Sequence, residues 1–107
     1  MSEYVDYLKE VFSEFGSVEP RRMFGGYGVF HKGLMFGLVA EEELYLKVDA
    51  EIELFFDALE LPYFDYEKKG KRYRMSYRKA PESLPDDPDE WREWALRSYQ
   101  AALRARK

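Results

Sequence analysis

The chain has 107 residues, the length of one ordinary domain, since domains commonly span about 50 to 250 residues. We therefore expect a single domain over residues 1–107. Apolar residues make up 46% of the sequence and aromatic residues 18%, which predicts a hydrophobic core and excludes a disordered chain. The absence of cysteine excludes disulfide bonds, thiolate chemistry and metal sites built on sulfur.

The formal net charge of −4 hides a segregation of charge along the chain. Residues 1–66 carry 5 basic and 14 acidic side chains, a net charge of −9, whereas residues 67–79 carry 7 and 1, a net charge of +6. The negative total argues against general affinity for nucleic acid. No stretch is long and apolar enough to cross a membrane, and the acidic first ten residues are unlike a secretory leader. We expect a cytoplasmic protein that does not contact membranes.

The first expected element is an amphipathic helix over residues 2–15, which Ser2 and Gly16 are suited to begin and end. The pattern then changes to short β-type runs separated by turns, which is typical of consecutive antiparallel strands. We place His31 in the first of these turns, exposed and without a special role. Three strands are predicted, over residues 23–30, 34–39 and 44–48.

Asp49 is suited to cap a second helix that ends near Leu59, before a proline. Two further strands, residues 63–67 and 71–77, surround a turn that contains Gly70. In the second of them, alternate residues share a face, so the sequence places three large side chains together: Tyr73, Met75 and Tyr77.

A third helix follows a proline-containing connection. Asp87 is its predicted cap, Pro88 its first residue, and Trp91 and Trp94 lie on its buried stripe. The order is therefore α-β-β-β-α-β-β-α. This order predicts the α+β class, with two layers and a five-stranded antiparallel sheet whose helices lie mainly on one face.

Most polar motifs in the sequence favour structural roles. The glycines at positions 25, 26 and 28 lack the spacing of a phosphate-binding loop, so we interpret them, with Gly37, as allowing a bulge, a strong bend or the close approach of a packed helix. The acidic runs 41–43 and 86–89 lack the spacing of a calcium loop and are interpreted as a solvated turn and a helix start. We predict no catalytic residue, no cofactor and no metal site.

The second hairpin carries the most informative charge. Basic side chains alternate there with tyrosine, a pattern found on surfaces that bind phosphates, bases or acidic proteins. Two arginines before the first strand would extend this surface if strand pairing brought them near. The candidate partner-binding residues are Arg21, Arg22, Lys68, Lys69, Lys71, Arg72, Arg74, Arg78 and Lys79.

Several interpretations of this hairpin stay open. It could be a solvated hairpin that resists edge-to-edge pairing, a docking surface for an acidic protein, or a nucleic-acid-binding surface. The nine tyrosines of the chain also suit a homodimer interface. A small-ligand site between the glycine-rich part of the sheet and the helices is an alternative of a different class.

Three segments together resemble the N-terminal domain of the TfoX/Sxy family, over about residues 21–104. They are MFGGYGVF, GLMFGLVAEEELYLKVD and FDYEKKGKRYRMSYRKAPESLPDDPDEWREWA. The resemblance implies a two-layer α+β fold that is also seen in secretion-chaperone-like proteins. It also implies a regulator of natural competence genes that contacts the cyclic-AMP receptor protein.

The resemblance implies no catalytic residue. The family's regulators carry a second, helical domain, and no counterpart follows Lys107, so a stand-alone first domain is expected. We therefore predict a non-enzymatic regulatory or adaptor domain that acts by protein contact, in which the basic hairpin meets the partner.

Overall fold

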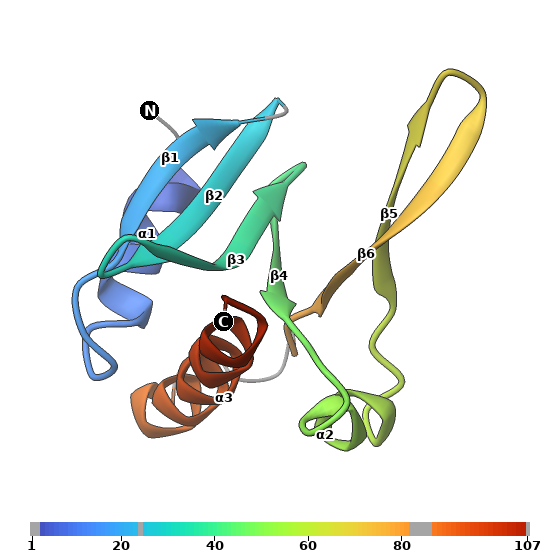
Figure 1. Ribbon diagram of the computed structural model, residues 1–107. Coiled ribbons are helices and arrows are strands. Elements are labelled where there is room, and N and C mark those ends of the chain that lie inside the picture. The colour runs from blue at the N-terminus through green and yellow to red at the C-terminus, as the bar shows by residue number, and fades with distance from the viewer. Residues whose placement is uncertain (1–2, 24, 82–86, 107) are drawn as a thin grey trace.

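The computed structural model describes residues 3–23, 25–81 and 87–106, which form three helices and six strands (Figure 1). In chain order these elements are α1 (Glu3–Val11), β1 (Glu19–Met23), β2 (Gly26–His31), β3 (Leu34–Ala40), β4 (Glu43–Lys47), α2 (Glu53–Asp57), β5 (Tyr63–Lys68), β6 (Lys71–Lys79) and α3 (Pro88–Arg106).

All six strands form one antiparallel sheet in the order β1-β2-β3-β4-β6-β5. One cluster of buried side chains joins all three helices to the sheet, so the core lies on a single face. The predicted α+β class is confirmed, and the sheet has one strand more than the predicted five. Sequence reasoning missed β1 because its residues, EPRRM, contain a proline and two arginines and no alternating apolar pattern.

The start of α3 follows the predicted capping pattern. Asp87 Oδ1 accepts hydrogen bonds from the N–H groups of Asp89 and Glu90, at 3.1 and 3.2 Å. These bonds satisfy two of the donors that the first turn of a helix leaves unpaired. The predicted cap at Ser2, and the part of the proline connection that spans residues 82–86, lie outside the described residues.

Two predictions at the N-terminal end need correction. Helix α1 ends at Val11 rather than at residue 15, and tight turns continue the chain to Gly16, whose N–H donates to the carbonyl oxygen of Phe12. His31 belongs to β2 and pairs with Leu34, so the turn consists of Lys32 and Gly33 alone.

The ring of His31 therefore packs instead of pointing into solvent. Its centroid lies 4.6 Å from that of Phe15 and 4.9 Å from that of Tyr99. Its Nδ1 lies 2.7 Å from the carbonyl oxygen of Ser17, which accepts a hydrogen bond. The prediction that His31 lies exposed in a turn was wrong, because a two-residue turn places His31 in the strand, beside α3.

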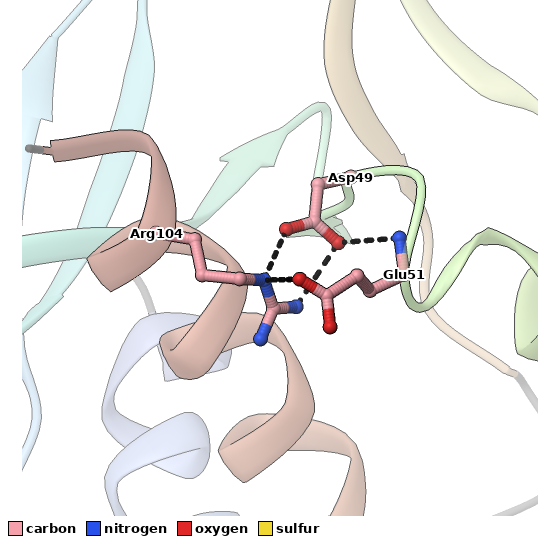
Figure 2. A network of polar contacts seen from close by, with 3 residues as sticks. All are labelled: Asp49, Glu51 and Arg104. Atoms are coloured by element: carbon pink, nitrogen blue, oxygen red, sulfur yellow. Dashed lines mark hydrogen bonds and ion pairs between the residues drawn. The ribbon is translucent and has the colours of Figure 1, made fainter.

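Helix α2 is also shorter than predicted, and the prediction that Asp49 caps it was wrong, because Asp49 lies before the helix and joins a polar network instead. The Nε of Arg104 lies 2.6 Å from Oδ2 of Asp49 and 3.0 Å from Oε2 of Glu51, while the Glu51 N–H donates to Asp49 Oδ1 (Figure 2). The residue at the helix N-cap is Ile52, which makes no side-chain capping bond. This network ties the last turn of α3 to the segment that leads into α2.

Acid should weaken that network. The hydrogen bond from Arg104 lowers the pKa of Asp49 in the folded chain, so its contribution to stability is present above the ordinary carboxyl pKa and is lost as pH falls through the lowered value. We expect Asp49→Asn to cost about 1 kcal/mol of unfolding free energy at pH 7 and much less near pH 2. Urea denaturation of both proteins at several pH values measures this; a cost that does not change with pH would contradict it.

Candidate functional site: a basic arm beside an apolar groove

The hairpin of β5 and β6 is divided by a bulge. Tyr63 pairs with Arg78 and Asp65 pairs with Arg74, so one residue on β5 faces three on β6. Such a mismatch bends a hairpin. Before the bulge, the base of the hairpin pairs with β4; beyond it, residues 64–75 pair only with each other. We call residues 64–75 the arm, and Figure 1 shows the hairpin projecting from the rest of the sheet.

The two faces of the arm differ in chemistry. On one face, acids lie directly opposite arginines: Asp65 opposite Arg74 and Glu67 opposite Arg72. On the other face, Tyr66 and Tyr73 stack with ring centroids 5.4 Å apart. The charged face compensates its own charges, whereas the aromatic face offers a surface for contact.

The tip of the arm holds three lysines without acidic partners. Lys68 lies directly opposite Lys71, and Lys69 forms the turn with Gly70, both at positive φ (53° and 77°). All three lysines are exposed, and within the described residues none forms an ion pair. Like charges directly opposite each other in a hairpin are destabilising. A bound anionic group would relieve this repulsion.

An apolar groove of about 280 Å³ separates the arm from the body of the sheet. The groove opens on the helix-free face, which is the face of the sheet opposite the core. Leu38 in its wall pairs with Gly28 and Tyr45, and the side chains of this row point away from the core because neighbouring residues of a strand point to opposite faces. Phe64 packs against Tyr45, with ring centroids 4.9 Å apart. The groove is lined by Met23, Gly26, Tyr27, Leu38, Val39, Ala40, Phe64, Tyr66, Glu67 and Met75.

The predicted basic residues do not form one continuous surface. Arg78 is buried: its Nη1 lies 2.6 Å from Oδ1 of Asp57, and its Nε donates to the carbonyl oxygen of Leu61 at 2.8 Å. Lys79 is half-buried and forms an ion pair with Glu43 at 2.9 Å. The two cations at the base of the hairpin, Arg78 and Lys79, therefore form their ion pairs within the fold. The exposed cations of the hairpin lie on the arm, and they are Lys68, Lys69, Lys71, Arg72 and Arg74.

Strand pairing does not place Arg21 and Arg22 beside the hairpin. They lie on β1, at the opposite edge of the sheet, with β2, β3 and β4 between them and β6. Arg21 forms an ion pair with Glu19 at 2.7 Å and lies over the ring of Phe30. The condition for extending the basic surface to these arginines is not met by strand pairing, because among the described residues β1 hydrogen-bonds to β2 alone.

The groove itself was missed from the sequence. Its walls come from β1, β2 and β3 on one side and from β5 and β6 on the other, so no single segment contains it. The sequence contained a partial signal, because Tyr73 and Met75 form an apolar row on a strand whose intervening residues are basic. The alternative of a small-ligand site between the glycine-rich part of the sheet and the helices concerns a different place, since this groove lies on the face opposite the helices, and it stays a prediction.

Burial acts on the nearby phenols. It raises the pKa of Tyr77 to about 12, and burial followed by the charge of Glu43 raises the pKa of Tyr45. Both phenols are therefore neutral at physiological pH, which suits the helix-free face to apolar contact. Within the described residues, no three His, Asp or Glu side chains gather where they could hold a metal ion, and no helix is long and apolar enough to cross a membrane.

This architecture defines a small α+β domain with an open antiparallel sheet that is covered on one face only. The model of the TfoX N-terminal domain family matches residues 10–102, a region that includes both the groove and the arm, and the chain belongs to this family. The resemblance stated from the sequence is thereby confirmed.

A curated relative is the DNA transformation protein TfoX1 of Aliivibrio fischeri. It is 31% identical to this chain over 88 residues, which cover 78% of the chain and 42% of the relative. The chain thus spans about two fifths of the length of that relative.

Proposed function

We propose that this chain is a regulatory domain that takes part in the control of natural DNA uptake by contact with another protein. It acts in the cytoplasm and catalyses no reaction itself. The name of the relative from Aliivibrio fischeri supports the link to DNA transformation. The observation that carries the mode of action is the set of unpaired lysines at the tip of the arm, beside an apolar groove.

The chemistry of this surface defines the partner. Carboxylates on the partner would face Lys68, Lys69 and Lys71, and one or two large apolar side chains would contact Tyr66 and Met75. Complementary charges accelerate association and fix orientation, while apolar contacts supply much of the affinity. A transcription factor with an acidic surface fits these requirements, and the cyclic-AMP receptor protein of the same organism is the partner to test first.

The test is a titration of this chain with that purified receptor protein, followed by calorimetry with and without cyclic AMP. We expect binding that weakens as salt is raised. Reversing all three lysines (Lys68→Glu, Lys69→Glu, Lys71→Glu) should weaken binding about 100-fold, at about 1 kcal/mol for each charge. A matched variant that reverses three exposed cations elsewhere, Lys9→Glu, Lys32→Glu and Arg106→Glu, should bind normally.

The same variants connect the contact with its role in the cell. In the organism that encodes the chain, deletion should lower the frequency of transformation, and only the control variant should restore it. Equal restoration by both variants would contradict a role for the tip. Binding of single-stranded DNA or RNA that weakens steeply with salt, in place of the receptor protein, would favour the nucleic-acid alternative.

A further inference from the structure

We propose that two copies of this chain associate through their grooved faces, with the tip of each arm against the β3–β4 turn of the other copy. The surface that carries this inference has a basic end, an apolar middle and an acidic end. The basic end is the lysine tip, and the middle is the groove. The acidic end is the turn of Glu41 and Glu42, which directly follows Ala40 in the wall of the groove.

The acidic turn, like the basic tip, carries charged side chains that form no ion pair among the described residues. Ala40 pairs with Glu43, so Glu41 and Glu42 alone form the turn, and both are exposed. Lys79 forms an ion pair with Glu43, but neither residue of the turn forms an ion pair in the part of the chain that the structure describes. The turn therefore presents two exposed carboxylates, of which Glu42 also lines a pocket with Tyr4 and Lys79 on the helix side of the sheet.

The fold places the two charged ends on either side of the groove. One wall of the groove ends at Ala40, next to the acidic turn, and the other wall is the arm that ends in the lysine tip. Figure 1 shows the β3–β4 turn and the tip of the arm projecting toward the same end of the molecule. A second copy that approaches from this side meets both charged ends together.

A second copy of the chain supplies the opposite charge for each charged end of the surface. In a two-fold dimer the same patch meets itself, so residue i of one copy contacts residue j of the other and the reverse. A patch with opposite charges at its two ends and an apolar middle complements itself in this arrangement. The two-fold rotation places the tip of each copy against the turn of the other, and it places the two grooves against each other. The rings of Tyr66 and Tyr73, each 42% exposed in the single chain, then become more buried at the interface.

The charge distribution of the whole chain favours this occupant. The arm, residues 64–75, has 5 basic and 2 acidic side chains, and the rest of the chain has 12 and 19, so the arm of one copy is attracted to the body of another. The inference requires only this chain, but it uses the same lysine tip as the proposed function, so dimer formation would compete with receptor binding.

Sedimentation velocity over a range of concentrations tests the proposal. We expect the wild-type chain to shift from 12.8 kDa toward twice that mass as its concentration rises, and to dissociate in high salt. Glu41→Lys/Glu42→Lys and Lys68→Glu/Lys69→Glu should each raise the dissociation constant of the homodimer by about tenfold or more, because both contacts change from attraction to repulsion.

The decisive sample is an equimolar mixture of those two variants. The first has a positive turn and a positive tip, and the second has a negative turn and a negative tip. Each turn in a mixed dimer therefore meets a tip of opposite charge, and dimers should form again at the wild-type concentration. This recovery also shows that both variants are folded. Glu10→Lys/Glu14→Lys, which reverses two exposed acids near the N-terminal end, serves as the control and should dimerise like the wild type.

Three results would overturn the proposal. The first is a wild-type chain that stays monomeric at every concentration, whether or not another molecule binds this face. The second is a dimer that neither variant weakens. The third is an equimolar mixture of the two variants that stays monomeric. The turn variant also separates this inference from the proposed function, because it leaves the lysine tip intact. Normal receptor binding by a monomeric turn variant would support both proposals, whereas failure of that monomer to bind the receptor would contradict only the proposed function.

Discussion

Phe12→Ala should remove about 4 kcal/mol of unfolding free energy, a large share of the 5 to 15 kcal/mol that is usual for a domain. The side chain is fully buried, and its ring centroid lies 5.7 Å from that of Phe36 and 5.8 Å from that of Trp91. It thus joins the end of α1 to β3 and α3, and its loss leaves a cavity where three elements meet. Thermal unfolding followed by circular dichroism should show the midpoint lowered by roughly 15 to 30 °C.

The control for this substitution is Leu54→Ala. Leu54 lies in α2 and is 76% exposed, so its truncation removes little buried surface. Its cost should stay within about 0.5 kcal/mol. Similar costs for the two substitutions would contradict the position of Phe12 in the core.

Gly26→Ala should destabilise the chain by about 3 kcal/mol, although it adds only one methyl group. A Cβ at this position would lie 2.1 Å from the carbonyl oxygen of Val39, which is backbone and cannot move aside as a side chain can. The start of β2 would have to move away from β3, and the groove wall that Gly26 and Val39 share would open. Denaturant unfolding measures the cost.

Gly33→Asn is the matched control, because Gly33 has a φ of +79° and no atom lies within 4 Å of its added Cβ. Asparagine tolerates this left-handed conformation, so we expect a cost below about 1 kcal/mol. If Gly26→Ala were as mild as this control, β2 and β3 would not approach as closely as the structure requires.

Locally encoded features were predictable from the sequence. The turn at Lys69 and Gly70 and the cap at Asp87 depend on a few neighbouring residues, and both are present. The glycine-rich segment was interpreted as permitting a bulge or a close approach. The structure has a bulge, where the register shifts between Val29 and Phe30, whereas the close neighbour of Gly26 is the backbone of β3 and not a helix.

Features that depend on distant segments were not predictable. Both Arg78 and Arg74 are basic residues of one strand, yet only Arg78 is buried, because α2 brings Asp57 to it. The groove likewise requires the strand order and the bulge near Phe64, neither of which periodicity specifies. The candidate site was therefore found in part: its cations were identified, while its apolar floor and the separation of Arg21 from it were not.

The bulge in the hairpin of β5 and β6 has a consequence for how the surface can diversify. Residues beyond it hydrogen-bond only within the arm, and a two-stranded ribbon contributes little to the stability of a core on which it does not pack. Changes of charge or length at the tip therefore leave the folding of the body almost untouched. Related chains can acquire new binding preferences by altering this one projection, while the scaffold that holds it is inherited unchanged.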